Sequence, residues 1–135
     1  MSIHENKRTA RRLVMEVFNA GKAELVDALL APNYVDHALP PDVPADRDGL
    51  TNTIHRLQQA FPDLEYSIED QIAEGNKVAQ HVTGRGTLKG EFMGMQPTNK
   101  TATWHEIHWY RFDVNGRVAE HWDVTDSLGM MMQLQ

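Results

Sequence analysis

The sequence predicts an α+β fold in which helices precede an antiparallel sheet. Up to residue 61 the apolar residues recur at helical spacing, and from Leu64 onward they alternate with polar residues, as in strands with one buried face. Helices followed by a run of strands are typical of α+β domains, in which the helices cover one face of the sheet. We therefore expect three N-terminal helices packed on a curved antiparallel sheet that encloses a pocket.

Each of the three predicted helices has an apolar stripe and a residue that ends it. The first ends at Gly21, the second at Ala31-Pro32 and the third just before Pro62, because glycine and proline interrupt helical hydrogen bonding. A loop rich in proline and aspartate is expected over 38–49. The stripes consist of Ala10, Leu13, Val14, Val17 and Phe18, then Leu25, Val26, Leu29 and Leu30, and finally Leu50, Ile54, Leu57 and Phe61.

Strands are expected in the second half of the chain, separated by turns. The first runs from Leu64 to a turn at 74–77, and the second starts at Val78. Glycine and proline interrupt 86–100, which predicts a short strand and a loop. The last two strands are expected over 101–113 and 117–124. Asn115-Gly116 between them predicts a type I′ hairpin, because both central residues of that turn need positive φ.

The predicted hairpin brings ionisable residues of two strands together. If Asn115 and Gly116 are the central turn residues, His108 pairs with Asp123 across the strands, with Cβ atoms about 5 Å apart. One face of the sheet then collects apolar walls and proton-transfer groups, which makes it a candidate acid–base site. This face consists of Trp104, Glu106, His108, Tyr110, His121 and Asp123.

Two other arrangements of these strands remain open. A register shift of two residues would pair His108 with His121, and a one-residue bulge would break the pairing. The ionisable face could also be exposed, with the opposite, more apolar face forming the core or a subunit contact, where aromatic residues are enriched. That opposite face consists of Ile107, Trp109, Val118, Trp122 and Val124.

Composition limits the function classes. The 135 residues suit a single domain over 1–135, and a net charge of −6 with interspersed signs disfavours a nucleic-acid partner. The basic cluster at residues 7–12 is expected to be a solvated helix face. With no cysteine, disulfide and thiol chemistry are excluded. We see no signal segment and no apolar run of membrane-spanning length, so we expect a cytoplasmic protein without a membrane partner.

The segment His105-Glu106-Ile107-His108 has the residue types of a metal motif but not its geometry. Zinc proteases place two histidines four apart on a helix, whereas this segment is rich in strand-forming residues. Neighbours on a strand alternate between faces, so His105 and His108 point to opposite sides and cannot share an ion. We therefore expect no metal site from this pair.

Longer motifs run along nearly the whole chain. They are Tyr34-Val35-Asp36-His37, Phe61-Pro62-Asp63-Leu64, Ile68-Glu69-Asp70, and the stretches 73–78, 90–100 and 115–123. Together they resemble the SnoaL-like polyketide (ester) cyclases of the NTF2-like superfamily, whose cone-shaped domains share a cystatin-like α+β fold. This resemblance is specific for the SnoaL-like group but not for one reaction, because the fold hosts many chemistries.

The resemblance implies a reaction and an assembly. It implies an intramolecular aldol condensation that closes a ring of a polyketide-like ester without metal or organic cofactor. The implied acid/base is Asp123, with His108 beside it, on a face that lines the cavity. The resemblance also implies a homodimer or homotetramer formed through sheet faces, which would cover Trp109 and Trp122.

A small hydrophobic or polycyclic substrate is the expected partner. In this reading Asp123 removes a proton α to a carbonyl, and His108 or His37 donates to the enolate oxygen. Tyr34 and Trp104 could stack on a flat substrate. The expected substrate-binding residues are His37, Tyr34, Trp104, Glu106, Tyr110, His121, Phe92 and Met93.

Other activities would use the same pocket. A hydrolase, a dehydratase, an isomerase and a non-catalytic binder of a small hydrophobic ligand are the alternatives. An epoxide hydrolase of this fold would need an Asp-Arg-Asp arrangement, and Arg111 is predicted to lie on the wrong face for that role.

Overall fold

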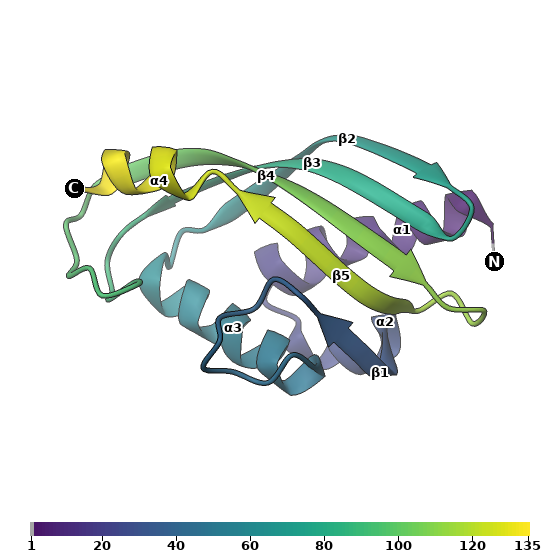
Figure 1. Cartoon of the computed structure of the whole chain (residues 1–135). Helices are drawn as coiled ribbons and strands as arrows, with labels where there is room; N and C mark the ends of the chain where they lie inside the picture. Colours follow the sequence, from purple (N-terminus) through teal and green to yellow (C-terminus); the bar gives the residue numbers. More distant parts are fainter. Residues whose placement is uncertain (1) are drawn as a thin grey trace.

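A curved five-stranded sheet forms the frame of the protein in the computed structural model, which describes residues 2–135 (Figure 1). The strand order is β1-β5-β4-β3-β2, and all neighbours are antiparallel except β1, which runs parallel to β5. The strands are β1 (Leu30–Asp36), β2 (Glu65–Glu74), β3 (Lys77–Thr87), β4 (Thr101–Phe112) and β5 (Val118–Thr125). The predicted α+β class is confirmed, with the exception of the parallel edge.

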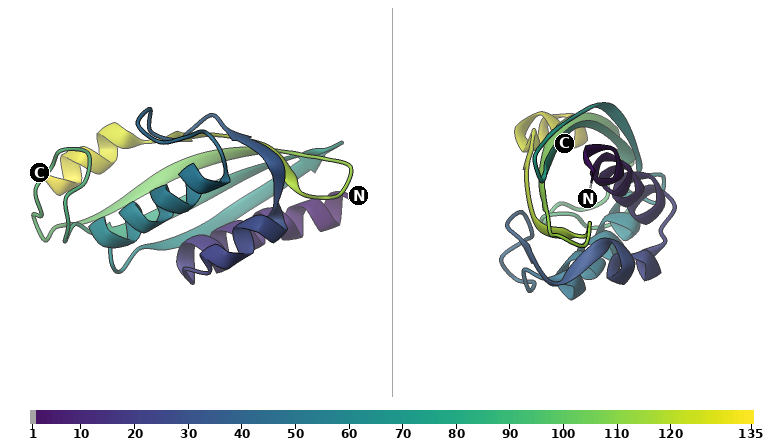
Figure 2. Two further views of the ribbon diagram at one scale, coloured as in Figure 1. Left: turned by 90° about the horizontal axis from the view of Figure 1, so that it is seen from below. Right: turned by 90° about the vertical axis from the view of Figure 1, so that its right-hand side faces the viewer.

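Helices cover the inner face of the sheet (Figure 2). Helix α1 (Ile3–Arg12) continues as the π-helical segment η1 (Leu13–Asn19), and a 3₁₀ turn, η2 (Ala23–Leu25), leads into the short α2 (Val26–Leu29). Helix α3 (Arg47–Ala60) begins at Asp46, whose side chain accepts a hydrogen bond from the amide of Gly49. The first helix ends as predicted at Gly21, which has φ +70°.

Two elements were not predicted. Strand β1 begins at Leu30, which had been placed on the second helix, and it contains Pro32. Proline is tolerated there because β1 is an edge strand, where a missing N–H breaks no ladder bond. The C-terminal helix α4 (Ser127–Leu134) starts at Asp126, which caps the amide of Gly129. Its run of methionines carries no clear amphipathic pattern, so periodicity did not reveal it.

The hairpin between β4 and β5 differs from the prediction in its turn but not in its pairing. Only Gly116 has positive φ, and Asp113 and Arg117 bound a three-residue loop instead of a two-residue type I′ turn. That extra loop residue shifts the register by one, as seen in the Phe112–Val118 pair. A bulge at Ala119 shifts it back. His108 therefore still pairs with Asp123.

The bulge also changes which residues face inward. Val118, predicted for the opposite face with Trp109, is fully buried in the core beside Phe112. Ala119 is buried next to it, so two consecutive residues of β5 point inward. The rest of the strand alternates as predicted.

The core consists of two apolar clusters under the sheet. One is built around η1, α3 and the ends of β1, β4 and β5, and the other around Phe61 and Trp104. Both of these aromatic side chains are almost fully buried, which contributes roughly 2–3 kcal/mol each through the hydrophobic effect. The clusters hold the helices against the sheet and leave a cavity between them.

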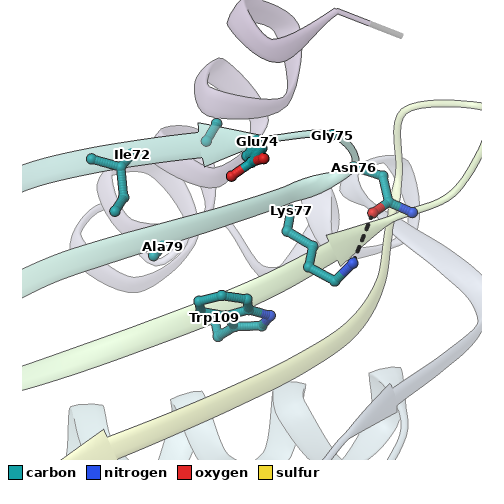
Figure 3. A pocket seen from close by; sticks show the side chains of 8 residues that line it. Ile72, Glu74, Gly75, Asn76, Lys77, Ala79 and Trp109 are labelled. Atoms are coloured by element: carbon teal, nitrogen blue, oxygen red, sulfur yellow. Dashed lines mark hydrogen bonds between the residues drawn. The ribbon is translucent and has the colours of Figure 1, made fainter.

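The outer face of the sheet is uncovered within residues 2–135 and carries exposed apolar side chains among polar ones. Ile107, Trp109 and Val124 are exposed there, as the alternation of β4 and β5 predicts. A shallow hollow over β2, β3 and β4 is lined by Ile72, Trp109 and the turn at 74–77 (Figure 3). Over the described part of the chain, no helix has both the length and the apolar character needed to cross a bilayer.

Candidate active site

A cavity of about 390 Å³ lies between the inner face of β4 and β5 and the elements that cover it. Its apolar walls come from η1, α3, β2 and the 92–93 loop. Its polar end is formed by ionisable side chains of β1, β4 and β5. The apolar residues include Phe18, Leu50, Leu57, Tyr66, Phe92 and Trp104, and the ionisable ones are Asp36, Glu106, His108, His121 and Asp123.

Most of the predicted site residues meet at this cavity. Seven of them line it, namely Phe92, Met93, Trp104, Glu106, His108, His121 and Asp123. Met93 is largely exposed and adopts φ +50°, which places it on the open side. Tyr110 lies behind the two imidazoles, stacked 5.0 Å from His121, and its hydroxyl donates to Gln80. Tyr110 lines only a small adjoining void.

Two predicted residues lie elsewhere. His37 is exposed on the outer face, where it stacks on Trp122 at 4.7 Å and hydrogen-bonds Glu120 at 2.8 Å. The prediction that His37 lies at the pocket is wrong, because β1 continues the alternation through Asp36 and turns the next residue outward. Tyr34 points inward but is buried in the core beneath the cavity, so it has no free ring face for a substrate.

A continuous line of hydrogen bonds crosses the polar end of the cavity. Glu106 Oε1 is 2.7 Å from His108 Nε2, His108 Nδ1 is 2.7 Å from His121 Nε2, and His121 Nδ1 is 3.1 Å from Asp36 Oδ2. All four residues are buried. At one end Trp104 Nε1–H donates to Glu106, and at the other the hydroxyl of Tyr34 donates to Asp36.

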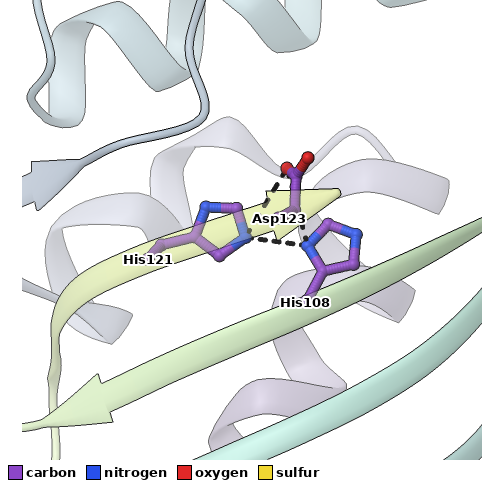
Figure 4. Close-up of side chains that lie close together, drawn as sticks. All are labelled: His108, His121 and Asp123. Atoms are coloured by element: carbon purple, nitrogen blue, oxygen red, sulfur yellow. Dashed lines mark hydrogen bonds and ion pairs between the residues drawn. The ribbon is translucent and has the colours of Figure 1, made fainter. Parts of the chain in front are cut away.

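Asp123 stands beside the imidazole pair. Its Oδ2 is 3.8 Å from both His108 Nδ1 and His121 Nε2, outside hydrogen-bond range but within ion-pair range (Figure 4). Its only side-chain hydrogen bond within residues 2–135 comes from the hydroxyl of Thr125 at 3.4 Å. About 23% of its side chain is exposed, so a molecule in the cavity can reach its carboxylate.

The pKa values of the three inner carboxylates are shifted in different directions. Burial raises the pKa of Asp123 above its usual value. The nearby imidazoles of His108 and His121 act to lower this pKa, and the negative charges of Glu106 and Asp36 offset part of that lowering. Burial would raise the pKa of Glu106 as well, but hydrogen bonds from His108 and Trp104 lower it below its usual value. The pKa of Asp36 is lowered in the same way, by His121 and Tyr34 against burial.

The same surroundings shift the pKa values of His108 and of three tyrosines. Burial disfavours a charged His108, yet Glu106 and the charges of Asp123 and Asp36 raise its pKa above the ordinary value. Burial raises the pKa of Tyr34, Tyr66 and Tyr110 well above the usual range, so these phenols stay neutral. The line of hydrogen bonds therefore has an ionised carboxylate at each end, Glu106 and Asp36, and a positive charge is favoured on His108 between them.

Three of these side chains could be considered as metal ligands. His108, His121 and Asp123 each offer one ligand atom within 4.8 Å of the others. Two nitrogens bound to one zinc ion at ordinary bond lengths and tetrahedral angles are about 3.3 Å apart. The observed 2.7 Å between His108 Nδ1 and His121 Nε2 is instead a hydrogen-bond distance. The arrangement present thus fits a shared proton better than an ion.

Asp36 is the functional residue that the sequence reasoning missed. It is 2% exposed, and its Oδ1 accepts the amide of Ala38 while its Oδ2 faces His121. It reaches the site because β1 pairs with β5 in parallel, with Asp36 opposite His121. The motif Tyr34-Val35-Asp36-His37 was the available signal, since alternation on one strand puts its first and third residues on one face.

Comparison with known proteins places this geometry in a family. The model of the SnoaL-like polyketide cyclases matches residues 8–134. A comparison with curated proteins finds no significant match. Among solved structures, IdmH of Streptomyces antibioticus, a candidate polyketide cyclase, has 33% identity and a TM-score of 0.84, over 97% of this chain and 99% of IdmH.

Two further structures share the fold. AclR of Streptomyces galilaeus, a candidate hydroxylase, has 30% identity and a TM-score of 0.85, over 98% of this chain and 86% of AclR. TsrD of Streptomyces laurentii has a TM-score of 0.90 over 99% of this chain and 97% of TsrD, and its 24% identity supports the fold alone. With a family match over nearly its full length and these similar structures, the chain belongs to the SnoaL-like polyketide cyclases of the NTF2-like fold.

Proposed function

We propose that this protein is an ester cyclase that closes a ring in a polyketide-like substrate by an aldol-type reaction, with acid–base groups of the chain and no cofactor. The observation that carries the proposal is the position of Asp123, a carboxylate of raised pKa at the polar end of an apolar cavity, 3.8 Å from two imidazoles. Family membership supports the substrate class.

The first step is removal of a proton from carbon. Asp123 accepts the proton from a carbon that lies between two carbonyl groups of the substrate, and its raised pKa makes it a stronger base than an ordinary aspartate. The electron pair moves into the carbonyl and forms an enolate. The positive charge favoured on His108 stabilises the enolate oxygen.

Ring closure then returns the site to its starting state. The enolate carbon attacks a second carbonyl of the same molecule, which forms the carbon–carbon bond and an alkoxide. The alkoxide takes a proton from the imidazole pair, and Asp123 passes its own proton back to that pair. No proton is gained or lost over the cycle. The apolar walls around Phe92 and Trp104 hold the reacting carbons in contact.

The experiment is a cyclisation assay with β-keto esters tethered to an aromatic ring system, followed by mass spectrometry and NMR of the product. The proposal predicts a product of unchanged mass, or one that has lost water, with a new carbon–carbon bond. Hydrolysis of the ester would indicate a hydrolase instead, and oxygen uptake would indicate an activity like that named for AclR. Tight binding without turnover by any member of the panel would indicate a binder.

We also propose that two copies associate through the outer face of the sheet. Support comes from the exposed apolar side chains of Ile107, Trp109 and Val124, since aromatic and aliphatic residues are enriched in homodimer contacts. Sedimentation of the wild type should show a dimer, and Trp109→Glu should shift it to a monomer. A wild-type monomer at micromolar concentration would contradict this assembly.

A further inference from the structure

The two imidazoles of the cavity form part of a longer unit than the reaction above uses. One nitrogen of each imidazole is hydrogen-bonded to the other imidazole, and its second nitrogen is hydrogen-bonded to a buried carboxylate. The order of the unit is Glu106, His108, His121, Asp36. It has three hydrogen-bonded links, at 2.7, 2.7 and 3.1 Å. Asp36 has no role in the proposed reaction so far, and His121 enters it only as the partner of His108.

Counting protons along this unit gives its charge. Each hydrogen bond needs one proton between its two heavy atoms, so three links need three protons. Two ionised carboxylates bring none, and two neutral imidazoles bring two. Without a third proton, His108 Nδ1 and His121 Nε2 would face each other at 2.7 Å with two lone pairs, which is repulsive. Because their hydrogen bonds lower the pKa of Glu106 and of Asp36, both carboxylates are ionised, and the additional proton gives the imidazole pair a single positive charge.

The surroundings favour that positive charge. Besides Glu106 and Asp36, the carboxylate of Asp123 lies 3.8 Å from both facing nitrogens. The remaining ionisable neighbours are phenols: Tyr34 bonds Asp36, Tyr66 lies at Glu106, and Tyr110 is stacked on the imidazoles. Among residues 2–135, no lysine or arginine lines the cavity. A buried cluster with three carboxylates and no such cation is stabilised by one imidazolium.

We infer that Glu106, His108, His121 and Asp36 form one proton-sharing unit that holds a single imidazolium charge spread over both rings, and that this unit is the acid of the site. Asp36 and Glu106 are positioning residues, because they fix which nitrogen of each ring carries its own proton. Where it concerns turnover, the inference rests on the proposed cyclase activity. The charge of the resting protein does not depend on it.

Replacing either terminal carboxylate by its amide should remove the charge without breaking the links. Ala38 N–H holds Oδ1 of residue 36, so in Asp36→Asn the new NH₂ group stands at the position of Oδ2 and donates to His121 Nδ1. The hydroxyl of Tyr34, which donates to Oδ2 in the wild type, then accepts the second N–H of this group. His121 then donates to His108, and His108 to Glu106. All three links are satisfied by neutral imidazoles.

Glu106→Gln should have the same result from the other end. Trp104 Nε1–H holds Oε2 of residue 106, so the NH₂ group of glutamine faces His108 Nε2 and donates to it. Tyr34→Phe is the matched control, because it removes a hydrogen bond to Asp36 but leaves the three links in place. If Asp36→Asn does not fold, Glu106→Gln tests the same prediction.

The experiment is ¹⁵N NMR of the histidine rings in the full-length protein without substrate, from pH 5 to 9, with His108 and His121 assigned by single substitution. We expect the wild type and Tyr34→Phe to keep one imidazolium charge shared by the two rings at pH 7. The two amide variants should have neutral rings at pH 7. Neutral rings in the wild type at pH 7, or an unchanged charge in both amide variants, would overturn the inference.

Two further readouts separate the possibilities. A stoichiometric metal ion that survives chelation, found by elemental analysis of the purified protein, would overturn the shared proton in favour of an ion. In the cyclisation assay, Asp36→Asn should lower kcat about 100-fold with little change in KM. A shared charge seen by NMR in a protein that cyclises nothing would support the inference and reject the proposed activity, whereas turnover with neutral rings would do the reverse.

Discussion

Strand β4 contributes a histidine to a pair on each of its faces, and the two pairs differ in what lies beyond them. On the outer face, His105 Nδ1 is 3.1 Å from His81 Nε2 of β3, in contact with solvent. On the inner face, His108 and His121 are 2.7 Å apart, buried, and bonded at their far nitrogens to Glu106 and Asp36. A pair of histidines thus forms a surface contact on the outer face and part of a charged unit on the inner face. The carboxylates and the burial make the difference.

The largest expected effect is on turnover, from a change on the inner face of β5. Asp123→Asn removes the proposed base and should lower kcat in the cyclisation assay by about 10²–10⁴-fold. Its folding stability at pH 7 should stay the same or increase, because a buried carboxylate of raised pKa costs stability when ionised. Glu120→Gln is the control on the outer face of β5 and should keep wild-type kcat. Equal activity of both variants would remove Asp123 from the mechanism.

The two histidine pairs can be compared directly by truncation. His121→Ala removes the hydrogen bonds that His108 Nδ1 and Asp36 make with His121 in the buried site, which should cost about 1–3 kcal/mol of unfolding free energy. His105→Ala on the exposed pair should change it by less than about 0.5 kcal/mol. Urea unfolding of both variants measures the difference, and similar costs would mean that burial and carboxylate partners do not distinguish the pairs.

A change on β3 tests how tightly the inner face is packed. A Cβ at Gly84 would lie 2.6 Å from Cε2 of the Trp104 indole, closer than carbon atoms approach. Gly84→Ala should therefore displace Trp104, which positions Glu106, and should cost about 1–2 kcal/mol. Thr83→Ala, on the outer side of the same strand, should cost less. Unfolding of the two variants is the measurement, and a neutral Gly84→Ala would show that the indole has room to move.

The smallest expected effect is the pH dependence of stability. The lowered pKa values of Glu106 and Asp36 contribute stability above about pH 4, which is lost as pH falls through their folded pKa values. The raised pKa of His108 contributes stability below about pH 6.5, which is lost as pH rises through its folded pKa. The raised pKa of Asp123 acts in the same direction as His108.

Stability should therefore be greatest between about pH 4 and 6.5. The melting temperature as a function of pH measures this, and the double variant Glu106→Gln with His108→Gln should give a flatter curve. A maximum above pH 8 in the wild type would contradict the assigned directions.

Local patterns predicted most of the fold because they report burial one element at a time. The helical stripe of α3 and the period-two alternation of β4 each mark a buried face, and both were correct. The edge strand β1 was missed because its seven residues contain a proline and follow a helical stripe without a break. Helix α4 was missed because its own apolar residues occur on all sides of the helix and do not mark a single buried face.

Only the part of the site on the β4–β5 hairpin could be predicted from the sequence. Counting along β4 and β5 paired His108 with Asp123 because the two strands are neighbours in the sequence. Asp36 joins the site through a parallel pairing with His121, 85 positions further along the chain. The motif at 34–37 could indicate the face on which Asp36 lies, but not the strand with which it pairs. For the same reason His37 was predicted for the pocket, since the strand that turns it outward had not been recognised.

The bulge at Ala119, and not the length of the loop, decides which face of β5 carries the site. If β5 paired regularly from Val118 onward, Ala119 would lie opposite Arg111 and Trp122 opposite His108, so that His121 and Asp123 would project into water. A shorter or longer loop that keeps Asp113 paired with Arg117 leaves this frame unchanged. Relatives should therefore tolerate variation in the loop residues while retaining the extra residue of β5.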